Sequence, residues 1–240
     1  MTALHEWTRL KCQRSLGKTL FLSVCCGLIF SMACVGALAA MGICEDPILQ
    51  KFLYAGIFPI GLFLIGLNGY ELFTGDCMTL LFLRDADCGK RLLARLPVIY
   101  LGNVLGTLIG AAFCLVCGIP QRLDIAGRLI GLFETKTSYP LLTLALLAVG
   151  CNILVCMAVY LSMRAKSAGE RLILLYFPIF LFVLLGMEHL VANMVYLPLA
   201  YGLDPSLGLW PMLQNLIVVT LGNMLGGYLY ARSVAYQTKE

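Results

Sequence analysis

Residues 68–76 read NGYELFTGD and place polar and glycine residues inside an apolar run that extends over residues 52–83. A second apolar run, residues 171–203, is interrupted in the same way by GMEH at 186–189 and then by Asn193. Each run is too long for one straight helix across a bilayer. Irregular backbone at that depth survives only where it is buried in protein or lines a water-filled cavity. Because paired broken helices are typical of permeation sites, the sequence predicts two spans broken mid-membrane around a path for a solute.

The composition also indicates a membrane protein. Of the 240 residues, 60% are hydrophobic and 12% are charged, whereas a soluble domain carries roughly 25% charged residues. The first apolar run is too long for the core of a cleavable signal peptide, so we expect a retained first helix. We therefore predict an all-α polytopic membrane protein with six transmembrane spans, of which spans 2 and 5 are broken, near residues 18–43, 52–83, 92–117, 140–163, 171–203 and 211–234.

The basic residues predict the orientation of the chain. Of the 17 lysines and arginines, 13 fall in the N-terminal tail, residues 84–95, residues 164–171 and the C-terminal tail. The loops on the opposite side hold the other four: Lys51, Arg122, Arg128 and Lys136. Since cytoplasmic loops carry the excess of basic residues, both termini are expected on the cytoplasmic side of a plasma (inner) membrane.

A short motif recurs in the two halves of the chain. Residues 101–106 read LGNVLG and residues 221–226 read LGNMLG. Three spans per half is an odd number, so the halves would be inserted with opposite orientations, as an aquaporin-like inverted 3+3 repeat. The glycines allow close helix packing, and a buried asparagine, Asn103 or Asn223, can hydrogen-bond across helices. The alternative is two unrelated packing motifs. We expect one channel domain over residues 1–240, with tails at 1–17 and 235–240 and repeats at 18–117 and 140–234.

The cysteines of the chain do not indicate a metal site or a redox function. Most of the 11 cysteines lie in apolar runs, where they behave as small apolar residues. Cys114 and Cys117 form a CxxC motif, but no second pair stands at the spacing of a zinc site. We expect no metal, no cofactor and no nucleic-acid partner.

Four stretches together resemble the formate/nitrite transporter family. They are ELFTG at 71–75, GCNILVC at 150–156, EHLVANM at 188–194 and NLIVVTLGN at 215–223. The resemblance implies a homopentamer in the lipid bilayer, with one pore in every protomer. One departure from the family is Asp76-Cys77 after the first break, where other members often carry an uncharged residue.

The resemblance also implies roles for particular residues. Thr74 and His189 would face each other at the centre of the pore. Asn193 would be the partner of His189, Asn152 would face the pore, and Lys136 would lie in the vestibule. The outer constriction would be formed by Phe58, Leu62 and Phe182, and the inner constriction by Leu72 and Val155.

The residue types themselves favour part of this assignment. An ionisable side chain inside a span is costly and tends to mark an ion or proton path, which favours His189. For Glu188 and Glu71 we expect hydrogen-bonded groups that brace the broken backbone. Thr74 could instead be a helix cap, and Lys136, in a loop beside Glu134, could be a solvated surface lysine.

We therefore expect a channel or transporter for small monovalent anions, formate first. Either His189 lends or relays a proton and the substrate crosses as the neutral acid, or the His189 cation pairs transiently with the anion. Nitrite, hydrosulfide, acetate and lactate are alternatives that the sequence does not separate. A membrane enzyme using His189, Glu188 and Glu71 would need a nucleophile, metal or cofactor site, and the sequence shows no convincing one. A pore for water or glycerol would suit an inverted repeat, but the paired Asn-Pro-Ala signatures of aquaporins are absent. Whether the N-terminal tail closes the pore stays open.

Overall fold

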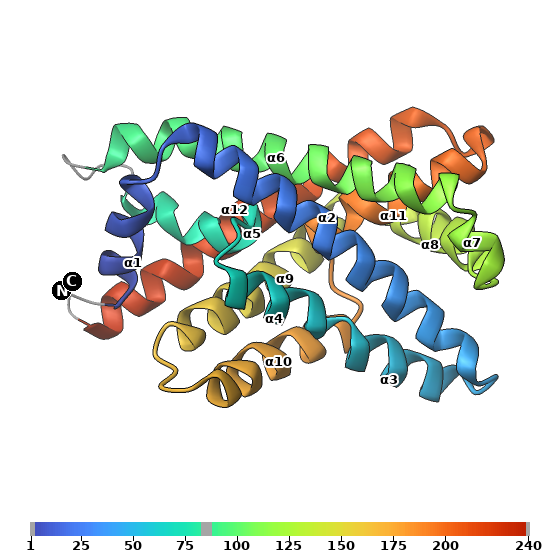
Figure 1. Cartoon of the computed structure of the whole chain (residues 1–240), viewed down its shortest axis with the longest axis horizontal. Coiled ribbons are helices and arrows are strands. Elements are labelled where there is room, and N and C mark those ends of the chain that lie inside the picture. Colours follow the sequence, from blue (N-terminus) through green and yellow to red (C-terminus); the bar gives the residue numbers. More distant parts are fainter. Residues whose placement is uncertain (1–2, 83–87, 239–240) are drawn as a thin grey trace.

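The computed structural model describes residues 3–82 and 88–238, and these form a bundle of helices without a β-strand (Figure 1). Arg84 and the end of the C-terminal tail, which entered the orientation argument, lie outside the described residues. Five helical stretches of the described chain are long and apolar enough to cross a membrane: α2 with η1 (Leu16–Ile43), α3 with α4 (Pro47–Asn68), α6 (Gly89–Val116), α9 (Leu141–Ser162) and α12 (Leu209–Thr238).

The predicted fifth span is divided between two shorter helices, α10 (Ala168–Leu184) and α11 (Leu190–Leu203). The second span begins with α3 (Pro47–Ile57) and α4 (Pro59–Asn68) and continues after a break as α5 (Phe73–Asp76) and η2 (Cys77–Phe82). The all-helical membrane architecture is confirmed. The remaining elements are α1 (Ala3–Cys12), η1 (Met41–Ile43), α7 (Ile119–Arg122), α8 (Ala126–Ser138) and η3 (Pro205–Leu207).

Each break begins at a glycine. Gly69 follows α4 with φ 64°, and Gly186 follows α10 with φ 67°, both in the left-handed region that glycine adopts without a steric penalty. The chain then runs extended, and the helices resume after Leu72 and His189, which have β-region dihedral angles. Both predicted interruptions are therefore present.

The connections of the bundle alternate between its two ends. Figure 1 shows α1, the start of α6, the α9–α10 turn and the end of α12 at one end, which we call the α1 end. The α2–α3 turn, α7 with α8, and the α11–α12 turn lie at the other, the α8 end. The loops predicted to be rich in Lys and Arg thus share one end of the molecule.

The glycines of the repeated motif pack two pairs of helices closely. A Cβ atom added at Gly106 in α6 would lie 2.1 Å from the carbonyl oxygen of Val24 in α2. A Cβ atom added at Gly226 in α12 would lie 2.4 Å from the carbonyl oxygen of Val149 in α9. The motif therefore has the same packing function in both halves, while the inverted orientation of the halves stays a prediction.

Candidate functional site

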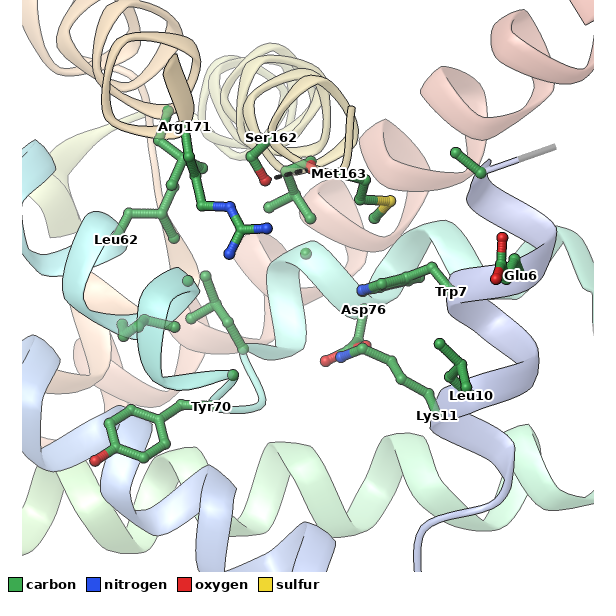
Figure 2. Close-up of a pocket in the computed structure, with 18 residues that line it drawn as sticks. Glu6, Trp7, Leu10, Lys11, Leu62, Tyr70, Asp76, Ser162, Met163 and Arg171 are labelled. Atoms are coloured by element: carbon green, nitrogen blue, oxygen red, sulfur yellow. Dashed lines mark hydrogen bonds and ion pairs between the residues drawn. The ribbon is translucent and has the colours of Figure 1, made fainter. Parts of the chain in front are cut away.

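Two cavities enter the bundle from its opposite ends. The α1 cavity has a volume of about 460 Å³, and its wall includes Trp7, Lys11, Leu62, Leu72, Asp76 and Arg171 (Figure 2). The α8 cavity has a volume of about 210 Å³, and its wall includes Tyr54, Phe58, Lys136, Phe182, Glu188 and His189. Both cavities therefore reach residues of the two broken spans.

A narrow apolar passage, which we call the constriction, adjoins both cavities. It is too narrow to hold a water molecule, and it is lined by Phe30, Phe58, Leu62, Val155, Ile179, Phe182 and His189. Leu62 also lines the α1 cavity, and Phe58, Phe182 and His189 also line the α8 cavity. A solute that moved from one cavity to the other through these residues would have to shed its water.

Aromatic rings form much of the constriction. The ring of Phe58 packs edge-on against Phe30, with centroids 5.4 Å apart, and against Phe182, with centroids 5.8 Å apart. The sequence predicted Phe58 and Phe182 here but gave no sign of Phe30 or Ile179, which look like any apolar residue of a span. The structure also places Val155 with Phe58 in this one constriction, and Leu72 on the wall of the α1 cavity.

The two breaks bring Thr74 and His189 together. The Oγ1 atom of Thr74 lies 2.9 Å from Nε2 of His189, and both residues are buried. The Nδ1 atom of His189 accepts a hydrogen bond from the backbone N–H of Ala192 at 3.2 Å, which caps α11. A neutral imidazole that accepts at Nδ1 carries its proton on Nε2, so Nε2–H donates to Thr74 Oγ1. Thr74 itself is not the cap of α5, because Leu72 holds that position.

Two asparagines of the repeated motif hold the breaks in place. The Oδ1 atom of Asn103 accepts from the N–H of Phe73 at 2.9 Å, and its Nδ2 donates to the carbonyl oxygens of Ser23 and Glu71. In the other half, Oδ1 of Asn223 accepts from the N–H of Leu190 at 2.9 Å. Its Nδ2 donates to the carbonyl oxygens at positions 148 and 188. Each asparagine thus satisfies backbone groups that the break leaves without helical partners.

Lys136 belongs to a buried polar network beside the second break. Its Nζ lies 2.8 Å from Oε1 of Glu188, and Oε2 of Glu188 accepts from Asn193 Nδ2 at 2.7 Å. Asn193 also donates to Oδ1 of Asn215, whose own Nδ2 donates to the carbonyl oxygen of Lys136. The alternative interpretation of Lys136 as a solvated loop residue is wrong, because it lies in helix α8 and is 8% exposed. Lys136 lines the α8 cavity, and its role as a vestibule residue stays a prediction.

Asn193 and Asn152, to which the family resemblance assigned roles in the pore, have contacts that the sequence did not predict. Asn193 binds Glu188 and Asn215 through its side chain, and only its backbone N–H reaches His189, at the carbonyl oxygen. Asn152 donates from Nδ2 to the carbonyl oxygens of Thr74, at 3.0 Å, and Asn223, at 2.6 Å. Asn152 therefore braces the residue that meets His189.

Glu71, in the first break, is surrounded by three cations, which come from α1, from the connection between α1 and α2, and from α6. It pairs with Lys11 of α1, with Arg14 at 2.7 Å and with Arg95 of α6 at 3.1 Å. Lys11 also pairs with Asp76, the acidic residue that departs from the family pattern. Because these partners come from distant parts of the sequence, nothing local in the sequence marks them. Glu71 thus ties the first break to α1 and to α6, and its role as a brace of the broken backbone stays a prediction.

The residues described by the structure contain no group of three or more His, Cys, Asp or Glu side chains that could hold a metal ion.

Comparisons with known proteins point to one family. A family model described as formate/nitrite transporter matches residues 1–236. The chain is 36% identical over 183 residues to "Formate-nitrite transporter 3" of Toxoplasma gondii, a match that covers 74% of this chain but only 36% of that longer protein. It is 31% identical over 207 residues to "Formate channel FocA" of Haemophilus influenzae, covering 75% of this chain and 71% of that one.

Solved structures agree in fold. A "Pentameric formate channel with formate bound" superposes with a TM-score of 0.85 at 26% identity and covers 93% of this chain and 97% of its own. An "FNT family ion channel" superposes with a TM-score of 0.83 at 25% identity and covers 99% of this chain and 95% of its own.

Proposed function

Because the chain belongs to the formate/nitrite transporter family, we propose that it carries small monovalent anions, formate first among them, across a membrane. One observation carries this proposal. A histidine and a threonine hydroxyl meet at 2.9 Å, and the histidine lines a dry apolar constriction next to a cavity. A hydrogen-bond donor that can also titrate, placed where a charge would lose its water, suits a weak acid better than a fixed ion.

The energetics favour passage of the neutral acid. Formic acid has a pKa of ~4, so protonating formate at pH 7 costs about 4 kcal/mol. Moving an unpaired ion into an apolar medium costs on the order of 20 kcal/mol in the idealised case. The constriction would therefore pass formic acid far more readily than formate. Transport would then be coupled to a proton.

The chain's own residues can assist this step. The Nε2–H of His189, which now donates to Thr74, can donate instead to an oxygen of an anion that reaches the constriction. Thr74 Oγ1 can then take a hydrogen bond from the protonated substrate oxygen. We propose that His189 takes up a proton from cavity water at Nδ1 as the anion arrives, so that the imidazolium lends its Nε2 proton to the anion and a neutral imidazole remains. After passage the ring regains a proton at Nε2 and releases the one on Nδ1, while Asn152 and Asn223 keep Thr74 and α11 in position.

The assembly and its location are part of the same proposal. The solved relative named above is a pentamer, and we propose a homopentamer with one path per protomer. We place it in the plasma (inner) membrane with both termini in the cytoplasm, so that the α1 end faces inward. We propose no catalytic role for His189, Glu188 or Glu71.

Flux into proteoliposomes tests the proposal, with protein-free liposomes as the control for passive permeation of formic acid. We expect protein-dependent uptake of formate that rises as pH falls, by up to about tenfold per pH unit, because the neutral acid becomes more abundant by that factor. Nitrite and hydrosulfide in the same assay rank the substrates. Uptake that is independent of pH from 5 to 8 would exclude neutral passage. Uptake of glycerol without any anion would replace the proposal with a neutral-solute pore.

A further inference from the structure

The wall of the α1 cavity includes an arginine whose charge is unpaired within the part of the chain that the structure describes. Arg171 lines this cavity, and Figure 2 shows its guanidinium group pointing into the space between α10, the first break and α1. Among residues 3–82 and 88–238, no carboxylate pairs with this guanidinium and no acceptor takes a hydrogen bond from it. The other cation on the wall, Lys11, is already paired with Glu71 and Asp76.

The position of Arg171 in its helix is unfavourable on local grounds. Helix α10 begins at Ala168, so Arg171 lies in the first turn, where the positive end of the helix dipole disfavours a cation. The N-terminus of α10 is already capped, since Ser167 accepts from the N–H of Glu170. Arg171 therefore contributes neither to the cap nor to the dipole, and its guanidinium group faces the cavity instead.

We propose that Arg171 is the anion-binding residue of the α1 cavity and that it takes a planar carboxylate, a role that rests on the proposed function of the chain. A guanidinium group presents paired N–H donors that match the two oxygens of a carboxylate. The cavity of about 460 Å³ is far larger than the constriction, which has no room for water, so a hydrated anion can enter and wait there. Leu62, on the same wall, also lines the constriction, so the cavity adjoins it.

Tryptophan fluorescence can report this binding without any transport. The chain has two tryptophans: Trp7 lines the α1 cavity, and Trp210 lies at the start of α12, 68% exposed. In the full-length Trp210→Phe variant, the indole of Trp7 is the single tryptophan signal. Iodide, an anionic quencher, then measures the local anion concentration beside Trp7, and acrylamide, a neutral quencher, measures physical access.

We expect Arg171→Gln in this background to lower quenching by iodide about threefold at low ionic strength, the effect of one uncompensated charge several ångströms away. Quenching by acrylamide is expected to stay the same. Lys166→Gln is the matched control, because it removes one positive charge from the neighbouring α9–α10 turn, where Lys166 is exposed and outside the cavity wall. It is expected to leave both quenchers unchanged. Sodium formate should reduce the quenching of Trp7 by iodide more than sodium sulfate of equal ionic strength does, provided that Arg171 is present. In Arg171→Gln, the two salts should reduce this quenching equally.

Unchanged quenching by iodide in Arg171→Gln would overturn the proposal. An equal fall in the quenching of Trp7 by iodide and by acrylamide would also overturn the proposal, because Arg171 would then only hold α1 in place. If formate protects Trp7 while proteoliposomes show no formate flux, the transport proposal fails and the binding site stands. If flux is normal but protection is absent, the site fails and the transport proposal stands.

Discussion

The ion pair between Lys136 and Glu188 can be broken by replacing Lys136 with methionine, a side chain of similar length that carries no charge. Lys136→Met removes the ammonium group that lies 2.8 Å from Glu188 Oε1, in surroundings where the two side chains are 10% and 2% exposed. Glu188 then keeps Asn193 Nδ2 as its remaining side-chain donor. The substitution therefore leaves a buried carboxylate without its cation, which strongly destabilises the folded state.

The size of the effect follows from the burial of the pair. Removing one partner of a buried ion pair costs about 3–5 kcal/mol, which for a chain of this length corresponds to a fall of roughly 6–20 °C in melting temperature. The double variant Lys136→Met/Glu188→Gln leaves no charge behind, and the amide oxygen of the introduced glutamine can still accept from Asn193. We expect the double variant to recover at least half of the lost stability.

Thermal unfolding of the detergent-solubilised protein measures these differences, with Lys51→Met as the control because Lys51 is exposed at the same end of the bundle. A fall of less than about 2 °C in Lys136→Met, corresponding to under 1 kcal/mol, would refute the reasoning. A double variant that is less stable than the single variant would refute it as well.

Two further predictions concern the breaks and the helix packing. Asn103→Ala and Asn223→Ala each leave one buried N–H group and two carbonyl groups without a side-chain partner, so each should lower the free energy of unfolding by about 3 kcal/mol or more. Leu225→Ala, at a half-exposed position of α12, should change it far less; equal losses in melting experiments would contradict this account. Gly106→Ala should cost about 1–3 kcal/mol or more, because its Cβ would meet the Val24 carbonyl at 2.1 Å. Gly127→Ala, which meets nothing within 4 Å in α8, should be neutral or stabilising.

The breaks were predictable from the sequence because their causes are local. Glycine and polar residues within an apolar run leave few structures that a membrane tolerates. Helix α4 does end directly before Gly69, and α10 ends two residues before Gly186. The contact between Thr74 and His189 could not be predicted from local sequence in this way. Only the resemblance to a family brought these two residues together, since nothing in the spacing of the sequence specifies it.

Helix α8 was not predicted, because its polar and charged residues interrupt any long apolar run. Leu129, Phe133 and Lys136 are its buried residues, and their spacing of four and three follows one face of a helix. That pattern could have placed Lys136 on a buried face. Its partner Glu188 could not have been found in this way, because the two are brought together by packing between α8 and the second break.

The cations around Glu71 and the ring of Phe30 show the remaining limit of the sequence. Lys11 and Arg14, from the N-terminal stretch, and Arg95, from α6, meet one carboxylate, and each alone looks like a basic residue near the end of a span. Phe30 lines the constriction with its ring 5.3 Å from that of His189, yet its neighbours in the sequence are equally apolar. Such roles depend on the tertiary arrangement of the helices.

The imidazole of His189 is the centre of this account, and His189→Asn tests it with the least damage to the fold. Asparagine is a good helix cap, so it can still accept from Ala192 N–H and begin α11, but it cannot titrate. For a folded oligomer of normal elution volume, we predict that formate flux into proteoliposomes at pH 7 falls at least about tenfold, the value of one hydrogen bond, and that the remaining flux follows the abundance of the neutral acid. Flux at pH 7 with the rate of the unmodified chain would contradict the central claim that His189 lends the proton to the anion at the constriction.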